Sequence, residues 1–443
     1  MTPNLNSAVL PPSLPLRFIL TGVICLALGA VCLVARPDLL VEYHYNQHII
    51  ALTHLVVLGG IASIVMGAMY QLVPVALETK LFSQRLPKWH FHAHVIGFIG
   101  MVWMFWIWDM KQVGHFGSFV ALGFGLFIVN LFRTLRRVPH WNVIATAVAS
   151  SLVWLFLTMS AGLFLAAAKC WPISPFDPIA QLHAHAHLGI LGVFVMLIVG
   201  VSYKLIPMFA LSDIQNERRA RWSVGLLNAG LAALVVTMLF GSAWKLAAAL
   251  IIISGLALYG LEMRAMLRAR KRVVLDWGVK SFVTAVAMLI PLSFLALVLC
   301  WPGLPLNEWT ARLENLYGFL GIYGVVVFAI VGMLHKIIPF LVWHHTYSPH
   351  IGRRRIPALA EMYSSRVQLA AYGFYVAGLL LAGGAICAGH GALVRLGCAL
   401  LAMSFALFAV NVAKILVHWF QPRLGEPIGM PKAGIPSPKP AYG

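Results

Sequence analysis

Histidines are the side chains of this sequence most able to do chemistry. The chain has 17 of them, although only 10% of its residues are charged. His183, His185 and His187 alternate in the segment HAHAH, and His54 lies in another apolar stretch. An ionisable side chain inside a membrane-spanning helix is costly unless it is paired, so such residues are candidate functional sites. Imidazole is also a ligand of iron, copper and zinc.

His54 and His187 hold equivalent places in a pattern that occurs three times. Each copy ends in proline and has glycine seven and fifteen residues earlier; the first residue of the pattern, twenty before the proline, is His54, His187 or Phe319. The remaining positions are Gly59, Gly67 and Pro74; Gly192, Gly200 and Pro207; and Gly324, Gly332 and Pro339. Successive copies are 133 and 132 residues apart. This agreement at one period predicts a repeated structural unit.

The alternation in HAHAH predicts two centres. At about 100° per residue, His183 and His187 share one face of a helix and His185 points the opposite way. We expect His54 and His187, at equal depth, to be the axial ligands of one heme, because two imidazoles suit a low-spin electron-transfer heme. The alternative is that these side chains are core histidines bonded to backbone carbonyls.

A second group of histidines lies toward the opposite end of the predicted helices. His90, His92 and His94 open one apolar run, His335 lies in another, and His344 and His345 follow it. We expect a second heme or a copper ion to be held by His92 or His94 together with His335. His344 and His345 are further candidate metal ligands in this group, as His183 is in the first group. For the second group, the alternative is a belt of histidines at the lipid headgroups.

The elements that must position these histidines are membrane-spanning helices. The chain is 61% hydrophobic with a mean hydropathy of +0.87. Soluble proteins have a much smaller share of apolar residues. Apolar runs of spanning length occur near 16–36, 48–75, 91–110, 116–133, 142–168, 183–209, 221–241, 244–264, 279–300, 315–342, 366–388 and 392–418. We therefore predict an all-α integral membrane protein of twelve transmembrane helices, arranged as three pseudo-repeated four-helix units.

This predicted membrane domain covers residues 1–420, with units of about 1–138, 139–272 and 273–420. The first apolar run predicts a retained helix rather than a cleaved signal, and the Pro-rich segment 421–443 predicts a disordered cytoplasmic tail. Cys170 and Cys300 occupy matching CWP triplets, where either a disulfide or two free thiols would fit.

The net charge of +19 has a pattern that indicates topology. Starting from the connection after the second run, every second connection is rich in Lys and Arg, as in Arg353, Arg354 and Arg355, and those between hold about one each. Such alternation is the positive-inside pattern. It predicts cytoplasmic termini in a bacterial inner membrane and argues against nucleic acid as a partner.

Two segments resemble a known superfamily. His185 to Pro207, HAHLGILGVFVMLIVGVSYKLIP, resembles the helix of heme-copper oxidase subunit I that carries an HxH pair, especially in the C-type branch. Thr53 to Pro74 resembles the second helix of that subunit. The resemblance implies twelve helices in three arcs, low-spin heme ligation by His54 and His187, and high-spin heme ligation by His185. It also implies one or two hemes, a copper ion, a cytochrome c or quinol as redox partner, and small accessory subunits or an oligomer.

The sequence also departs from that superfamily. The family's HxH pair lies on the tenth helix, whereas here it lies on the sixth, and the seventh predicted helix has no histidine for a copper site. The HxxxY motif is absent as well. No binuclear oxygen-reducing centre is assigned, and the chain is more similar to the membrane proteins of nitric-oxide response that share this fold.

Two functions follow from the sequence. The first is a membrane heme protein that transfers electrons, or binds or reduces O2 or NO; as an enzyme it would be an oxidoreductase of the cytochrome c oxidase or nitric oxide reductase type. The second is a non-enzymatic transporter of a metal or small molecule, because transporters are also built from repeats. A reduced-minus-oxidised visible spectrum separates the two.

Overall fold

A computed structural model describes residues 10–426 of the chain. Most of the predicted Pro-rich tail, from residue 427 onward, lies outside the described residues. Long helices dominate the described part, joined by short connections that contain a few 3₁₀ turns, η2 (Pro37–Leu40), η6 (Ser348–His350) and η7 (Leu359–Met362). The predicted all-helical class is confirmed.

Twelve helical segments within residues 10–426 are long and apolar enough to cross a membrane, as the sequence predicts. Eight are single helices: α1 (Ser13–Ala35), α4 (Leu86–Ile107), α5 (Met110–Leu135), α6 (Val143–Cys170), α9 (Glu217–Leu239), α10 (Lys245–Arg268), α15 (Ser365–Ala388) and α16 (Gly391–Phe420). A ninth is interrupted at Met288 between α11 (Trp277–Ala287) and α12 (Leu289–Leu299). The other three run over Gln47–Ala76, Pro178–Ala210 and Glu308–His350.

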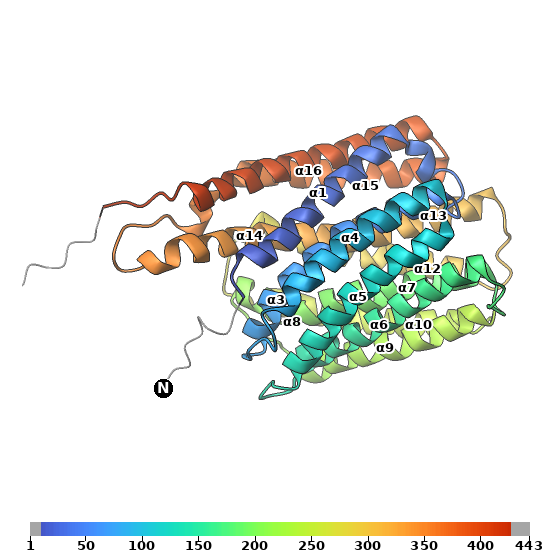
Figure 1. The fold of residues 1–443 in the computed structure, drawn as a ribbon, viewed down its shortest axis with the longest axis horizontal. Helices are drawn as coiled ribbons and strands as arrows, with labels where there is room; N and C mark the ends of the chain where they lie inside the picture. The colour runs from blue at the N-terminus through green and yellow to red at the C-terminus, as the bar shows by residue number, and fades with distance from the viewer. Residues whose placement is uncertain (1–9, 427–443) are drawn as a thin grey trace, which may run out of the picture.

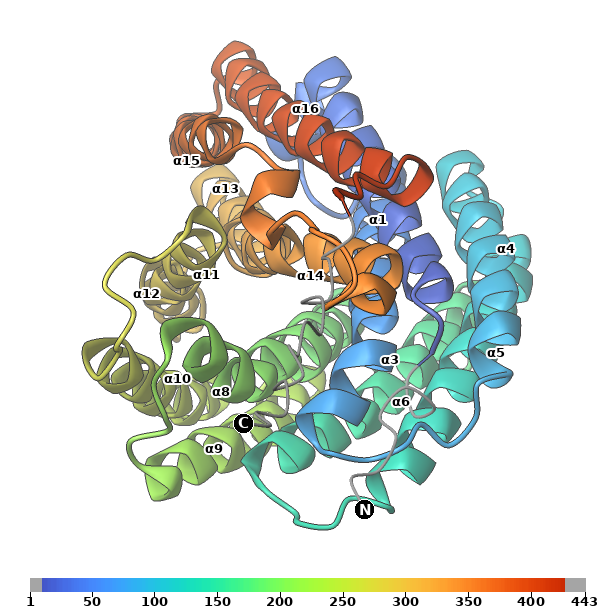
Figure 2. The ribbon, with the colours of Figure 1, turned by 90° about the vertical axis from the view of Figure 1, so that its left-hand side faces the viewer.

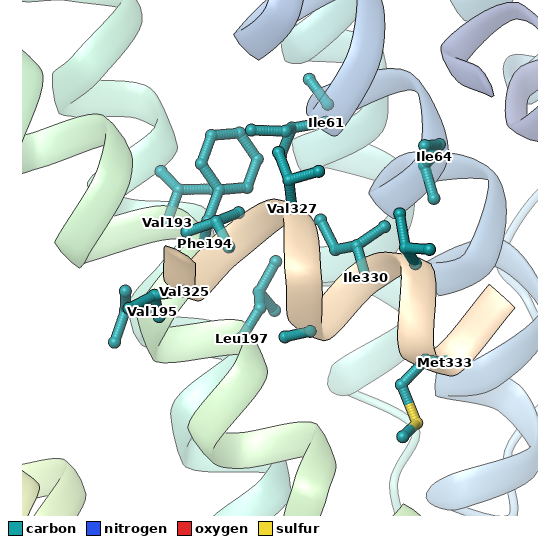
Figure 3. Packing of buried hydrophobic residues seen from close by; sticks show 14 of the residues in the cluster. Ile61, Ile64, Val193, Phe194, Val195, Leu197, Val325, Val327, Ile330 and Met333 are labelled. Carbon is teal, nitrogen blue, oxygen red and sulfur yellow. The ribbon is translucent and has the colours of Figure 1, made fainter. Parts of the chain in front are cut away.

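These three segments form the centre of the bundle (Figure 2). Their apolar windows are 56%, 67% and 83% buried, whereas the values for the other nine range from 22% to 44%. Their side chains meet in one core, which includes Ile61, Phe194 and Val327 (Figure 3). The nine outer segments surround them and leave their own apolar outer faces exposed, as expected where lipid is the solvent.

Each central segment contains a π-helical stretch of eight residues. The first segment consists of α2 (Gln47–His54), η3 (Leu55–Ala62) and α3 (Ser63–Ala76). The second consists of α7 (Pro178–His187), η4 (Leu188–Val195) and α8 (Met196–Ala210), and the third of α13 (Glu308–Phe319), η5 (Leu320–Val327) and α14 (Phe328–Tyr347). The three π-helical stretches begin directly after His54, His187 and Phe319. Such stretches are rare in proteins, and those that occur are often found at functional sites.

Glycines allow the close helix contacts around the centre. A Cβ on Gly22 of α1 would lie 2.6 Å from the carbonyl oxygen of Gly60 in η3. Gly278 of α11 and Gly332 of α14 approach each other in the same way, with 2.7 Å from a Gly278 Cβ to the Gly332 oxygen. Contact through small residues is typical of membrane helices, because it lets the backbones approach closely.

One end of the bundle carries most of the basic connections, including Lys80 and Arg85, Arg270 to Arg272, and Arg353 to Arg355. α1 begins and α16 ends there (Figure 1). Three connections at this end are fixed by a buried polar side chain that binds a backbone N–H 47 residues earlier. The pairs are Asn130 with Ser83, Glu262 with Gln215, and Asn411 with Ser364.

Candidate functional site

A large cavity is lined by residues of the three central segments and of the outer helices, toward the end where α2, α7 and α13 begin. Its volume is about 690 Å³, and its walls are mostly apolar. Five histidines line it: His44, His54, His183, His185 and His187. A cavity of this size with a few convergent polar groups is typical of a site for a cofactor or small molecule.

His54 and His185 face each other across part of this cavity. Their ring centroids are 6.5 Å apart and their planes differ by 17°. The separation is too wide for direct stacking. It equals roughly two metal–nitrogen bonds of about 2 Å plus the distance from each nitrogen to its ring centre. The separation of the two rings is therefore compatible with two imidazoles on one metal atom.

His54 is oriented by its own helix. Its Nδ1 donates a hydrogen bond to the carbonyl oxygen of Ile50 at 2.8 Å, because a carbonyl can only accept. Nε2 therefore carries the lone pair and is available to a metal, in the arrangement usual for metal-binding histidines. Phe105 of α4 stacks on the ring with a centroid distance of 4.5 Å. Asn46 caps α2 through the N–H of His48 and so fixes where the helix begins.

His185 is positioned by α7, which Asp177 caps and Pro178 opens. Its ring lies against Gly162 of α6, where a Cβ would be 3.0 Å from Cε1. Within the described residues, the buried Nδ1 has no partner of good hydrogen-bonding geometry. The ring is therefore held mainly by packing, and Gly162 provides the space for it.

His187 lies on the other side of α7 and faces a different partner. Its Nδ1 donates to the carbonyl of His183 at 2.8 Å, and its Nε2 accepts from the hydroxyl of Tyr317 at 3.2 Å. The predicted opposite orientation of His185 and His187 is thus present. The predicted pair of His54 with His187 is not the pair that the structure brings face to face, because a ring that points to Tyr317 cannot also point to His54.

Tyr317 is a site residue that the sequence reasoning missed. It lies 132 residues after His185, so it holds the place of His185 in the third copy of the pattern. The repeat period carries this signal, because it places a tyrosine in the third copy where the second copy has a histidine.

His183 belongs to a network at the outer rim of the cavity. Its Nε2 lies 3.1 Å from Nε2 of His44, and Nδ1 of His44 lies 3.6 Å from a carboxylate oxygen of Glu314. One of the two imidazoles must donate and the other accept, so they cannot both be protonated. Burial lowers the pKa of His44 below its usual value, which favours the neutral form that this contact needs.

The predicted inner metal site is not assembled as expected. His92 is exposed on the outside of α4, while His94 is buried and bonds Ser63 at 2.9 Å. His335 contacts Gln368, with 3.2 Å between Nδ1 and Nε2. His344 and His345 are exposed, and His345 stacks on Trp419. In residues 10–426, no three His, Cys, Asp or Glu side chains are grouped to hold a metal ion.

The two cysteines of the CWP triplets are free thiols. Cys170 is exposed at the end of α6, and Cys300 is buried after α12. Of the two alternatives left open by the sequence, the structure therefore has two free thiols and no Cys170–Cys300 disulfide.

No family model and no curated protein matches this sequence.

Proposed function

We propose that this chain is a membrane heme protein in which the imidazoles of His54 and His185 would together hold one heme. The observation that carries the proposal is the pair of nearly parallel imidazoles, 6.5 Å apart, on the wall of a large apolar cavity. Two imidazole ligands give a six-coordinate centre suited to electron transfer. The apolar walls suit the macrocycle and exclude water from it.

The chain's own residues have separate roles in this proposal. Ile50 and Phe105 orient His54, and Gly162 leaves room for His185. His187 and Tyr317 form a second polar point in the same cavity, since both line it. We assign to them the binding of a diatomic ligand such as O2 or NO, because distal hydrogen-bond donors control such binding.

The threefold organisation and the orientation are part of the same proposal. The π-helical stretches begin at Leu55, Leu188 and Leu320, which are 133 and 132 residues apart, and the 47-residue separation recurs in three connections. These repeats support three four-helix units of the heme-copper oxidase subunit I type. The basic end supports cytoplasmic termini in a bacterial inner membrane, with a cytochrome c or a quinol as electron donor.

One observation favours a transporter as a second candidate. The three central segments are each interrupted by a π-helical stretch beside the cavity, and interrupted helices at mid-membrane sites are common in transporters. A transporter in which the histidines bind a passing metal would be colourless as purified, whereas a heme protein would not.

The test is to express the full chain with ample heme supply, purify it in detergent, and record reduced-minus-oxidised spectra. We expect His54→Ala and His185→Ala each to abolish the sharp low-spin bands and His187→Ala to keep them. His92→Ala is the matched control, because His92 is exposed on α4. Retention of the bands in His185→Ala with loss in His187→Ala would restore the His54–His187 pair, and a colourless wild type would refute the heme proposal.

A further inference from the structure

A second pair of histidines lies outside the cavity, sealed between α3, α4 and α5. His90 and His94 are one helical turn apart on α4, and both side chains are fully buried. Their ring centroids are 5.7 Å apart. His92, between them in sequence, faces outward and is exposed. Neither His90 nor His94 lines the cavity of the proposed heme.

Each of these two rings is held by one nitrogen and leaves the other without a partner. Nδ1 of His90 lies 2.9 Å from the hydroxyl of Tyr70, and Nε2 of His94 lies 2.9 Å from Oγ of Ser63 and 3.2 Å from the carbonyl of Leu58. The other two nitrogens, Nε2 of His90 and Nδ1 of His94, are buried without a hydrogen bond among the described residues. A buried unpaired polar atom is costly, so the pair of them calls for an explanation.

The hydrogen bonds limit what kind of partner is missing. Because the Leu58 carbonyl can only accept, His94 carries its proton on Nε2, and its unpartnered Nδ1 is a bare lone pair. In the tautomer in which the Tyr70 hydroxyl accepts from Nδ1 of His90, Nε2 of that ring is a lone pair as well. In that tautomer the two lone pairs cannot bond each other and need an electron-pair acceptor. Metal-binding histidines show the same arrangement, with one ring nitrogen hydrogen-bonded and the other on the metal.

The residues around the two rings favour a monovalent over a divalent cation as that acceptor. The ring centroids of Phe18 and Phe127 lie 4.9 and 5.6 Å from that of His90, and the centroid of Phe124 lies 5.6 Å from that of His94. Within residues 10–426, no ion pair joins either histidine to a carboxylate. Zinc and other divalent ions prefer four or more ligands, and burying a double charge costs far more than burying a single one. A monovalent d¹⁰ ion such as Cu(I) accepts two neutral nitrogen ligands, and aromatic faces attract a cation.

We propose that His90 and His94 form a two-ligand site for Cu(I), with Tyr70 and Ser63 as positioning residues. The site is independent of the proposed heme, since it shares no histidine with it. It also differs from the copper site expected from the sequence, because His92 and His335 take no part.

The experiment is an anaerobic titration of the purified full chain with Cu(I) in the presence of a chromogenic Cu(I) chelator. We expect the wild type to retain about one copper per chain against the chelator, and His90→Gln and His94→Gln each to retain almost none. His92→Gln, on the exposed face of the same helix, is the matched control and should behave as the wild type does. X-ray absorption of the loaded protein should show Cu(I) with nitrogen ligands only.

Two outcomes would overturn the proposal. If the wild type retains no copper, the two nitrogens are bridged by ordered water only. If copper is retained by His90→Gln and His94→Gln but lost in His185→Gln, the metal binds in the cavity instead. Elution of each variant as the same single species in size-exclusion chromatography shows that it has folded, and a milder Tyr70→Phe variant, with weakened but measurable retention, tests the site if a Gln variant does not fold.

Discussion

At the scale of single residues, the tautomers of the histidines decide what each ring can do. His54 and His187 both donate from Nδ1 to the carbonyl four residues earlier, so each presents the Nε2 lone pair. The two rings nevertheless differ, because Tyr317 occupies the lone pair of His187, whereas among residues 10–426 no hydrogen bond reaches Nε2 of His54. The same residue type at equivalent positions in two copies of the pattern therefore has two different environments.

The contact between His44 and His183 gives a prediction for pH. Because burial lowers the pKa of His44 in the folded protein, the unfolded chain binds more protons as the pH falls below about 6.5. This group's contribution to stability is therefore complete above that pH and decreases as the pH falls toward the lowered pKa. We expect the midpoint of thermal unfolding in detergent to fall with decreasing pH, and to fall less in His44→Gln.

His115→Gln is the control for this experiment, because His115 is exposed near the beginning of α5. Its profile should follow that of the wild type. An unfolding midpoint of His44→Gln that depends on pH as strongly as the wild type's would mean that His44 does not carry the effect.

At the scale of elements, glycine contacts fix how the central segments pack. Gly332 of α14 meets only rigid neighbours: a Cβ there would lie 2.8 Å from the oxygen of Gly278 and 3.0 Å from the nitrogen of Phe282. Backbone atoms cannot rotate away as a flexible side chain can, so α11 and α14 would have to separate.

We expect Gly332→Ala to destabilise the protein by about 1–3 kcal/mol, the usual cost of overpacking a core. Gly125→Ala is the matched control, since a Cβ at Gly125 of α5 meets nothing within 4 Å, and alanine favours a helix over glycine by up to about 1 kcal/mol. Thermal unfolding of both variants measures the difference. Equal midpoints for the two would show that the α11–α14 contact tolerates a methyl group.

The π-helical stretches connect packing to the site. Each begins directly after residue 54, 187 or 319, and all three of these residues line the cavity. The helix therefore changes from α to π geometry at the cavity wall. In two of the three segments that last residue is a histidine on the cavity wall. Phe319 takes this place in the third segment, and there the polar group is Tyr317, two residues earlier.

At the scale of the whole molecule, the distribution of charge predicts which end faces the cytoplasm. Gln84, between α3 and α4, is at the basic end, and Ala243, between α9 and α10, is at the opposite end; both are exposed. In a Cys170→Ser background, which removes an exposed native thiol, we expect a membrane-impermeant thiol reagent to label Ala243→Cys in intact cells.

Gln84→Cys should be labelled only after the cells are opened. Labelling is read from the mass shift of the purified protein. The reverse pattern would place the basic end outside and would contradict the positive-inside reading of the sequence.

The sequence by itself determined the twelve apolar helices, the positions of the equivalent histidines and the opposite orientation of His185 and His187. These are local properties, because hydropathy and helical periodicity depend on residues close in the chain. The tertiary structure decided the partners: His185 lies opposite His54, and Tyr317 lies against His187. Such pairs join helices far apart in sequence, and their choice depends on how the central segments rotate and cross, which spacing along one helix does not contain.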